Sequence, residues 1–296
     1  MTESEATPIN PQETTKKDTE YPFEYFDAQV RFAQKWSELS GEPISQSLLS
    51  KTALYRRLTN VKPTATGDHP LWEEAMHVID SSASTEQISQ ALYSRYLAQE
   101  HSVYAPSSYP ENDGKHFGFF SFDHYPPNPQ TGERDRIKVH FINKSRGEKS
   151  GLDPMCLEQR QGDLRRMFQY VHEHCPEAQD VIGGSWLYAL QSYRDSFPQE
   201  FVSPQNMKRL VPKGFEHIPN SVPLMSFDGN SVWGQFVSRT GGVREHVYRE
   251  FTQNIEKSTN LEQLVEAFPN KPYQPKVPIE VFYKWSNVPT QNNQIS

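Results

Sequence analysis

Three histidines near the middle of the chain are the side chains best suited to proton transfer or metal binding. His116, His124 and His140 lie in or beside two predicted strands. Imidazole titrates near neutral pH and is the commonest metal ligand. The sequence has no metal-binding spacing, and His172 and His174 do not share one face of a helix. Packed or exposed histidines without a metal are therefore the favoured interpretation.

A basic loop follows the second of these strands. Residues 144–151 read Lys-Ser-Arg-Gly-Glu-Lys-Ser-Gly, with three cations, two glycines and two hydroxyl groups. Backbone N–H groups at a helix start, with arginine and lysine nearby, suit a phosphate or pyrophosphate. The P-loop pattern is absent, and a solvated surface loop is the commoner state of such a segment. The residues that could hold an anion here are Arg146, Gly147, Lys149, Ser150 and Gly151.

Hydroxyl and aromatic side chains gather where a third, apolar strand ends. Ser185 and Trp186 follow Ile-Gly-Gly at 182–184. Tyr188 and Tyr193 come next, and a tyrosine at a strand exit can donate a proton to a leaving group. Their spacing separates them by about 140° on a helix, so we expect at least one of them to pack in the core.

Hydrophobic periodicity predicts the elements that hold these candidates. Alternation of apolar and polar residues is typical of strands, and a proline just after an aspartate is a typical helix start. The predicted elements are strands over 116–124 and 136–143, a helix from Asp153 to about His174, a strand over 180–185 and a helix over 187–197.

The flanking segments complete the predicted architecture. Residues 23–100 show four amphipathic helical segments, the second over 44–58. Asp228-Gly229-Asn230 between apolar runs predicts a hairpin over 224–237, and alternation predicts a last strand over 277–283. Amphipathic helices need an apolar partner, and we expect the sheet to be that partner.

These patterns predict a mixed α/β (α+β) fold. A helical N-terminal region, residues 21–105, packs on a central mixed sheet inside an α/β core, residues 106–288. The polar ends, residues 1–20 and 289–296, are expected to be disordered.

Composition narrows the class of protein. The formal charge of −7 argues against a general nucleic-acid binder. The N-terminus lacks the apolar run of a signal peptide, and no apolar stretch is long enough to cross a membrane. Cys156 and Cys175 lie at opposite ends of one predicted helix, about 30 Å apart, which is too far for a disulfide. We expect a cytoplasmic protein with a small-molecule substrate and no membrane or nucleic-acid partner; the oligomeric state is left open.

The order of elements over about residues 115–240 resembles the GNAT acyltransferase superfamily: strand, basic glycine loop, helix, strand, helix. The loop's glycines stand at the second and sixth positions from Arg146, where the family has them at the fourth and sixth. The resemblance implies that His140 or Asn143 lies on the substrate strand and that the loop holds the coenzyme A pyrophosphate. It also implies that Tyr188 or Tyr193 protonates the leaving thiolate.

Three functional hypotheses follow. The leading one is an acyltransferase-like enzyme with an unknown acceptor, which needs no cofactor beyond an acyl-CoA co-substrate. The second is a non-catalytic ligand-binding or protein-interaction protein. The third is a metal-dependent hydrolase that uses the strand histidines. The expected substrate contacts are His116, His124, Asn143, Ser185 and Trp186.

Overall fold

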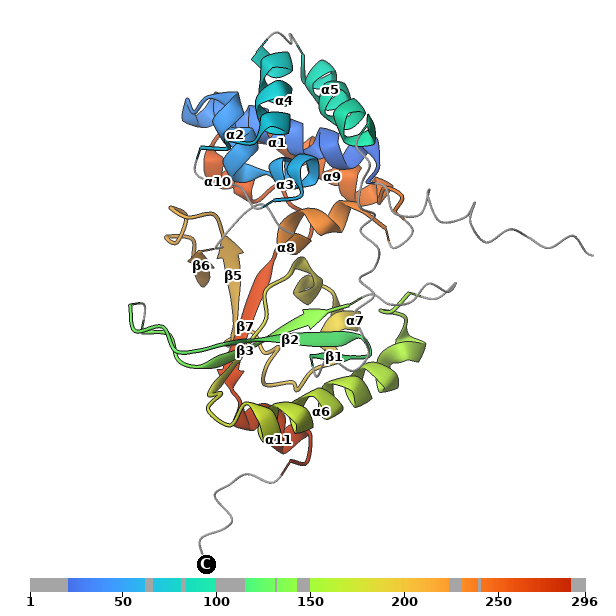
Figure 1. Cartoon of the computed structure of the whole chain (residues 1–296), viewed down its shortest axis with the longest axis vertical. Helices are drawn as coiled ribbons and strands as arrows, with labels where there is room; N and C mark the ends of the chain where they lie inside the picture. Colours follow the sequence, from blue (N-terminus) through green and yellow to red (C-terminus); the bar gives the residue numbers. More distant parts are fainter. Residues whose placement is uncertain are drawn as a thin grey trace, which may run out of the picture.

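Helices and a seven-stranded sheet form two lobes in this protein (Figure 1). The structure is a computed structural model, and it describes residues 21–61, 66–80, 84–98, 115–130, 132–142, 150–223, 230–238 and 241–288. The predicted mixed α+β class is confirmed. The terminal tails and residues 143–149 lie outside the described residues, so the predicted disorder of those tails stays a prediction.

The N-terminal helices form the upper part of the molecule in Figure 1. They are α1 (Phe23–Ser40), α2 (Ile44–Lys51), α3 (Leu54–Thr59), α4 (Pro70–Asp80) and α5 (Thr85–Ala98). The single helix predicted over 44–58 is wrong, because the chain breaks at Thr52 and Ala53. The backbone N–H of Ala53 donates to the buried Gln29 side chain of α1 at 2.7 Å, and the Thr52 hydroxyl donates to the Leu48 carbonyl at 2.5 Å. These bonds satisfy the polar groups that the break frees.

A second set of helices, which comes much later in the sequence, packs in the same region. It comprises α8 (Asn230–Trp233), the 3₁₀ helix η3 (Gly234–Phe236), α9 (Glu245–Lys257) and α10 (Leu261–Val265). The predicted hairpin over 224–237 is therefore wrong from residue 230 onward, and residues 224–229 lie outside the description. Val232, Trp233 and Phe236 are fully buried, and a short apolar run of this kind fits a helical turn as well as a strand.

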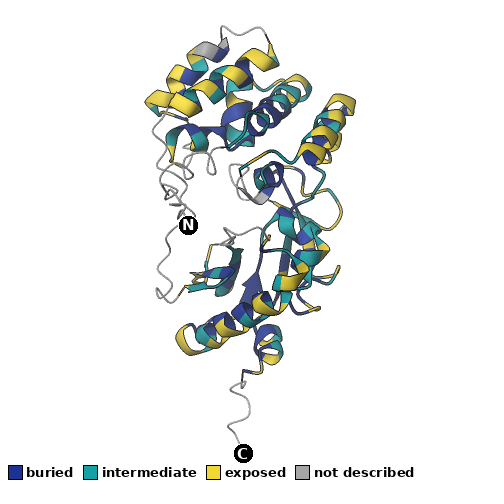
Figure 2. Cartoon of the chain, turned by 90° about the vertical axis from the view of Figure 1, so that its right-hand side faces the viewer, coloured by how far each residue is buried: buried dark blue, intermediate teal, exposed yellow. Residues whose placement is uncertain are grey.

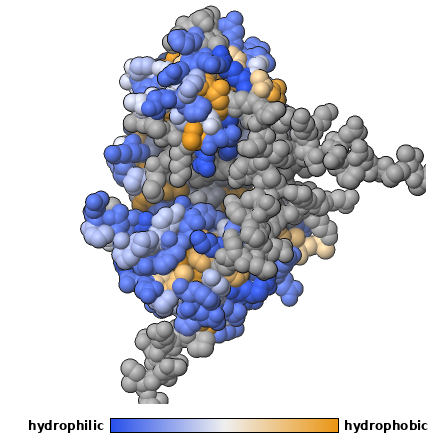
Figure 3. Space-filling view, viewed as in Figure 1, coloured by the Kyte–Doolittle hydropathy of each residue, from blue (hydrophilic) through white to orange (hydrophobic). Residues whose placement is uncertain are grey.

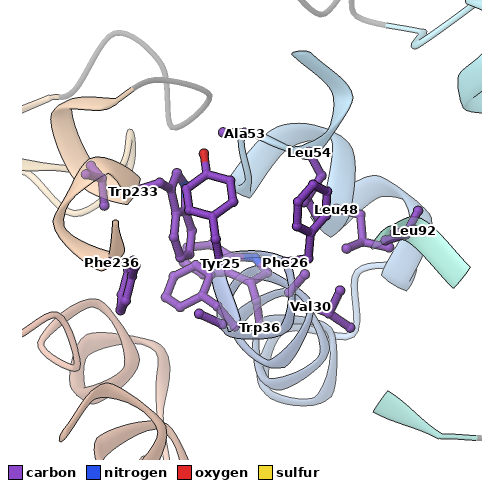
Figure 4. Close-up of a cluster of buried hydrophobic side chains, with 14 of the residues drawn as sticks. Tyr25, Phe26, Val30, Trp36, Leu48, Ala53, Leu54, Leu92, Trp233 and Phe236 are labelled. Atoms are coloured by element: carbon purple, nitrogen blue, oxygen red, sulfur yellow. The ribbon is translucent and has the colours of Figure 1, made fainter. Parts of the chain in front are cut away.

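These later helices supply the apolar partner that the sheet was expected to supply. We call α1–α5 with α8–α10 the helical lobe. Its core brings Trp233 and Phe236 toward α1 (Figure 4). The ring of Phe32 lies 5.5 Å from that of Trp233 and 5.2 Å from that of Phe268. Only Val211 extends this core into a strand, so the expectation that the N-terminal helices pack mainly on the sheet is wrong.

A buried carboxylate ties three helices of this lobe together. Asp27 of α1 is 1% exposed. It accepts hydrogen bonds from Ser89 of α5 at 3.0 Å, Tyr248 of α9 at 2.6 Å and Arg31 at 2.5 Å. A buried charge needs partners of this kind, so the network fixes how α5 and α9 lie against α1.

The sheet forms the second lobe, with the strand order β1-β2-β3-β4-β7-β5-β6. The strands are β1 (His116–Phe117), β2 (Phe120–Tyr125), β3 (Arg136–Phe141), β4 (Asp180–Ile182), β5 (Met207–Val211), β6 (Ser221–Pro223) and β7 (Tyr273–Pro278). The pairs β3–β4 and β5–β6 are parallel and the others antiparallel. After the chain leaves the helical lobe, β7 enters the middle of the sheet (Figure 1).

Helices cover one face of this sheet. The parallel strands β3 and β4 are joined through α6 (Leu157–His174), and α11 (Glu280–Trp285) packs beside α6. Leu164, Met167, Phe168 and Val171 have helical spacing and are fully buried against the strands. The predicted last strand over 277–283 is correct only to Pro278; Phe282 then stacks on Phe168 at 4.1 Å as part of α11.

A short irregular segment follows β4. The helix predicted over 187–197 is instead the 3₁₀ helix η2 (Trp186–Ala189) and the short helix α7 (Gln191–Arg194), interrupted at Leu190. Figure 2 shows buried residues concentrated inside each lobe, with exposed residues on the outer helix faces. No helix among the described residues is both long enough and apolar enough to cross a membrane.

Candidate functional site

The parallel strands β3 and β4 pair over only three residues. The last aligned pair is Lys138 with Ile182. Beyond it, β3 stays with β2 as far as Phe141, while the chain after β4 stays with β7, where the Gly183 N–H donates to the Pro275 carbonyl at 3.0 Å. No described residue pairs with 139–141 on the β4 side. This divergence lies at the carboxyl ends of parallel strands, where α/β proteins typically bind ligands.

The residues at this divergence are divided between the two faces of the sheet. Directly opposed strand residues share a face, and alternate residues point to opposite faces. Lys138, His140 and Gly184 therefore lie on the face away from α6, which we call the open face. Gly183 lies on the face that α6 covers.

A buried patch lies on the open face and at the exit of β4. Ile182, Trp186 and Leu210 are 7%, 6% and 4% exposed, yet they belong to neither of the two main cores. A Cβ atom added at Gly184 would lie 3.8 Å from Lys138 Cε and 4.0 Å from Leu210 Cδ1. We call the group of Lys138, Ile182, Gly184, Trp186, Leu210 and Arg244 the junction patch.

Arg244 brings the helical lobe into contact with this patch. Its guanidinium carbon lies 5.0 Å from the centre of the Trp186 ring. The side chain is partly buried, and burial lowers the pKa of the guanidinium. Among the residues that the structure describes, none forms a hydrogen bond or an ion pair with it. This contact could not be predicted from local sequence patterns, because the two residues belong to different lobes.

The two predicted tyrosines lie on the opposite, helix-covered side. Tyr188 and Tyr193 are each 1% exposed, with ring centres 5.0 Å apart. The Tyr188 hydroxyl has no hydrogen-bond partner in the described chain, and a Cβ atom at Gly183 would overlap it. Burial raises the pKa of both phenols well above the usual value. Both are therefore protonated at neutral pH, and Tyr188 can act as a donor beside the end of β4.

The predicted histidines are divided between the two faces. His116 is aligned with Ser121, which is aligned with His140, so these two histidines share the open face but stand two strands apart, roughly 9–10 Å. His124 is aligned with Ile137 on the other face. The three side chains therefore do not face one another. Among the described residues, no group of three or more His, Cys, Asp or Glu could hold a metal ion.

Two of these histidines pair with carboxylates. His140 Nε2 lies 2.9 Å from Asp123 Oδ2, and His124 Nε2 lies 2.7 Å from the buried Asp135 Oδ1. Burial lowers the pKa of His140 and the charge of Lys138 adds to this, whereas Asp123 opposes it. A carboxylate only accepts, so the neutral His140 ring carries its proton on Nε2 and leaves Nδ1 as an acceptor.

The end of the basic loop is fastened to the helix that follows. Leu152 N–H donates to Ser150 Oγ at 3.2 Å and Asp153 N–H to the Ser150 carbonyl at 2.8 Å. Met155 N–H donates to Asp153 Oδ1 at 2.9 Å. These donors are therefore already used within the chain. Asn143, Arg146, Gly147 and Lys149, which were predicted to bind substrate or coenzyme A, lie outside the described residues.

A buried arginine holds this loop end in place. Arg160 is 1% exposed, and its guanidinium donates to the carbonyls of Gly151 and Asp153 at 2.7 and 3.0 Å. It also donates to Ser196 Oγ at 2.8 Å and to the Ser192 carbonyl at 3.0 Å. The segment before α6 is thus tied to the segment around α7, on the same side as the tyrosines.

Comparisons with protein-family models, with curated proteins and with solved structures give no match to this chain.

Proposed function

We propose that this chain is an acyltransferase whose acyl-CoA-type thioester donor lies between the diverging ends of β3 and β4. The observation that carries the proposal is the early end of pairing at Lys138 and Ile182. It leaves one edge of residues 139–141 without a backbone partner among the described residues. An extended ligand with amide groups can add to such an edge as a strand would.

The basic segment 144–151 would bind the phosphate end of the donor. The chain that leaves β3 becomes the basic loop 144–151 and then enters α6. Arg146 and Lys149 would supply cations to the diphosphate, and backbone N–H groups of the loop would supply further donors. Ser150 and Gly151 anchor the end of that loop through the bonds already described.

The chemical step needs a base that deprotonates the acceptor and a hydrogen-bond donor that stabilises the negative charge of the oxyanion. The acceptor nucleophile attacks the thioester carbonyl, an oxyanion forms, and the C–S bond then breaks to release a thiolate that takes up a proton from water. His140 Nδ1 would receive the acceptor's proton. The protonated Tyr188 hydroxyl would donate a hydrogen bond to the developing negative charge. These groups lie on opposite faces, and a ligand that passes between the separated strands would meet both.

A second candidate function, ligand binding without catalysis, is favoured by the burial of the tyrosines. The ring centres of Phe197 and Phe201 lie 5.5 and 6.0 Å from that of Tyr188, so Tyr188 also has a packing role. A protein-interaction surface has less support: on the coloured part of the face shown in Figure 3 the apolar spots are small, and the large exposed hydrophobic residues of the described chain are dispersed in sequence. Among the described residues these are Val61, Leu71, Leu97, Tyr125 and Met155.

Calorimetry with coenzyme A and acetyl-CoA tests the proposal. We expect saturable binding that an Arg146→Ala/Lys149→Ala double variant weakens by about tenfold or more, ~1.4 kcal/mol. The matched control is Lys35→Ala/Arg249→Ala, which removes two cations from the helical lobe. Absence of binding at millimolar ligand would contradict the proposal, and so would equal affinity in the wild type and the double loop variant.

Binding must then be separated from catalysis. If the second candidate is correct, coenzyme A or another anion binds, but acetyl-CoA is not consumed faster with protein than without it over a panel of amines. If the acyltransferase proposal is correct, His140→Gln and Tyr188→Phe keep the affinity for acetyl-CoA and lower the rate of transfer by about 10²-fold or more.

A further inference from the structure

Arg244 places a positive charge at the junction patch that no described residue neutralises. The contact that it makes there is with the face of the Trp186 ring. Cation–π contacts contribute about 0.5–2 kcal/mol, and withdrawing a guanidinium from water without an anionic partner is unfavourable. Within the described part of the chain, the partial burial of Arg244 therefore lacks the compensation that proteins usually provide.

Other arginines of this chain show what that compensation looks like. Arg160 is 1% exposed and uses its guanidinium in four hydrogen bonds at 2.7–3.0 Å. Arg31 pairs with Asp27, and Arg209 pairs with Glu266. Arg244 differs from these three because no described residue accepts a hydrogen bond from its guanidinium, and the planar guanidinium suits a carboxylate or a phosphate.

The surroundings of Arg244 restrict the kind of anion. The Trp186 ring lies against the guanidinium of Arg244, and Lys138 reaches the same patch through its contact at Gly184. A small inorganic anion would contact the charges and not the aromatic ring. An organic group with an anionic end would use both the charge and the Trp186 ring.

We infer that the junction patch binds a carboxylate- or phosphate-bearing organic molecule through Arg244, with Trp186 as the platform beneath the guanidinium. The open face also holds His140, the expected base. The anion site thus identifies the acyl acceptor as an amphipathic anion, an assignment that rests on the proposed acyltransferase function.

Three small probes test the anion site in the full chain: phenylacetate, phenyl phosphate and the uncharged phenylacetamide, at constant ionic strength. The readouts are the melting temperature and tryptophan fluorescence, with Trp186→Phe used to isolate the signal of Trp186 among five tryptophans. At least one anion should raise the melting temperature and change the fluorescence, whereas phenylacetamide should not. Which anion binds more tightly distinguishes a carboxylate acceptor from a phosphorylated one.

Arg244→Gln should weaken anion binding by about tenfold or more, and Arg244→Lys should weaken it less, because the charge remains while the planar fork is lost. Arg249→Gln, an exposed arginine of α9, is the matched control and should bind like the wild type. Equal binding by Arg244→Gln, or equal effects of the charged and uncharged probes, would overturn the inference. If Arg244→Gln does not fold, Arg244→Lys and Trp186→Phe carry the same test.

Coenzyme A separates this inference from the proposed function. We expect Arg244→Gln to bind coenzyme A as tightly as the wild type. A tenfold loss would place Arg244 at the donor and overturn the acceptor assignment. Anion binding that depends on Arg244, in a wild-type protein that does not bind coenzyme A, would contradict the acyltransferase proposal and leave the anion site standing.

Discussion

Buried polar side chains of the helical lobe and of the sheet lobe differ in whether they have hydrogen-bond partners. In the helical lobe the buried Asp27, Gln29 and Gln235 all have hydrogen-bond partners. In the sheet lobe five buried side-chain atoms of the described chain have no hydrogen-bond partner: Arg136 Nε, Tyr188 OH, Arg194 Nε, Arg209 Nε and Ser286 Oγ; a sixth, Asp180 Oδ2, has only an ion pair with Lys276 Nζ at 3.0 Å. Unsatisfied buried groups reduce stability and are often retained for function. The helical lobe therefore resembles a scaffold, and the sheet lobe is where a ligand would complete the structure.

The largest expected effect comes from breaking the network of the helical lobe. Asp27→Ala leaves Tyr248 and Ser89 without their acceptor and should lower the free energy of unfolding by about 3 kcal/mol or more. Urea unfolding measures it. The control is Glu38→Gln, which removes an exposed ion pair with Lys35 and should change stability by at most about 0.5 kcal/mol. Equal effects of the two substitutions would contradict the scaffold interpretation.

Adjacent glycines of the sheet lobe offer the next test. A Cβ atom at Gly183 would overlap the Tyr188 ring and hydroxyl, whereas one at Gly184 would make ordinary contacts at 3.8 and 4.0 Å. Gly183→Ala should therefore cost about 2–3 kcal/mol and Gly184→Ala less than about 1 kcal/mol. Thermal unfolding of the pair measures the difference. If the two variants are equally stable, Tyr188 does not lie closely against β4.

Replacing a tyrosine by phenylalanine should change the free energy of unfolding differently in the two lobes. Tyr188→Phe removes a buried hydroxyl that has no partner in the described chain, so stability should stay the same or rise by about 1 kcal/mol. Tyr248→Phe removes a hydrogen bond to a carboxylate and should cost about 1–2 kcal/mol. Denaturant midpoints of the two variants decide this. A loss of stability in Tyr188→Phe would show that its hydroxyl has a structural partner after all.

The smallest expected effect is the pH dependence that His140 contributes. Its pKa is lowered in the folded state, so the unfolded chain takes up the proton more readily. The stability that depends on this residue is present above its ordinary pKa of about 6.5 and is lost as the pH falls toward the folded-state value. Between about pH 7.5 and 5.5, wild type should lose more stability than His140→Gln. An identical pH profile for the two proteins would contradict the burial of this imidazole.

Local patterns predicted the elements whose partners are close in the chain. The helix α6 follows from the spacing of Leu164, Met167, Phe168 and Val171, and the predicted start at Asp153 is where the side chain of this residue caps the 3₁₀ helix Pro154–Cys156 that leads into α6. The alternation of Ile137 and Val139 identified β3 and its faces. In these cases the periodicity of the residues matches the single surface that they bury.

The errors arose where the burying surface comes from a distant segment. Val232, Trp233 and Phe236 are apolar because they meet α1, and a short apolar run does not reveal whether its partner is a helix or a strand. Arg244 was missed for the same reason, because its ring partner lies in the other lobe. At least one of Tyr188 and Tyr193 was expected to pack in the core, and both do; the face of the sheet on which each candidate lies depends on the strand register.

The position of β7 in the sheet has a consequence for how the chain is made. Among the described strands, β1–β4 and β5–β6 are joined only through β7, which comes after all of them in the sequence. Until residues 273–278 have been synthesised, the two halves of the sheet remain separate pieces with unpaired edges. The helices of residues 230–265 can join the N-terminal helices earlier. Nascent chains should therefore acquire protease resistance in the helical lobe first, and the candidate site should form only after residues 273–278 have left the ribosome.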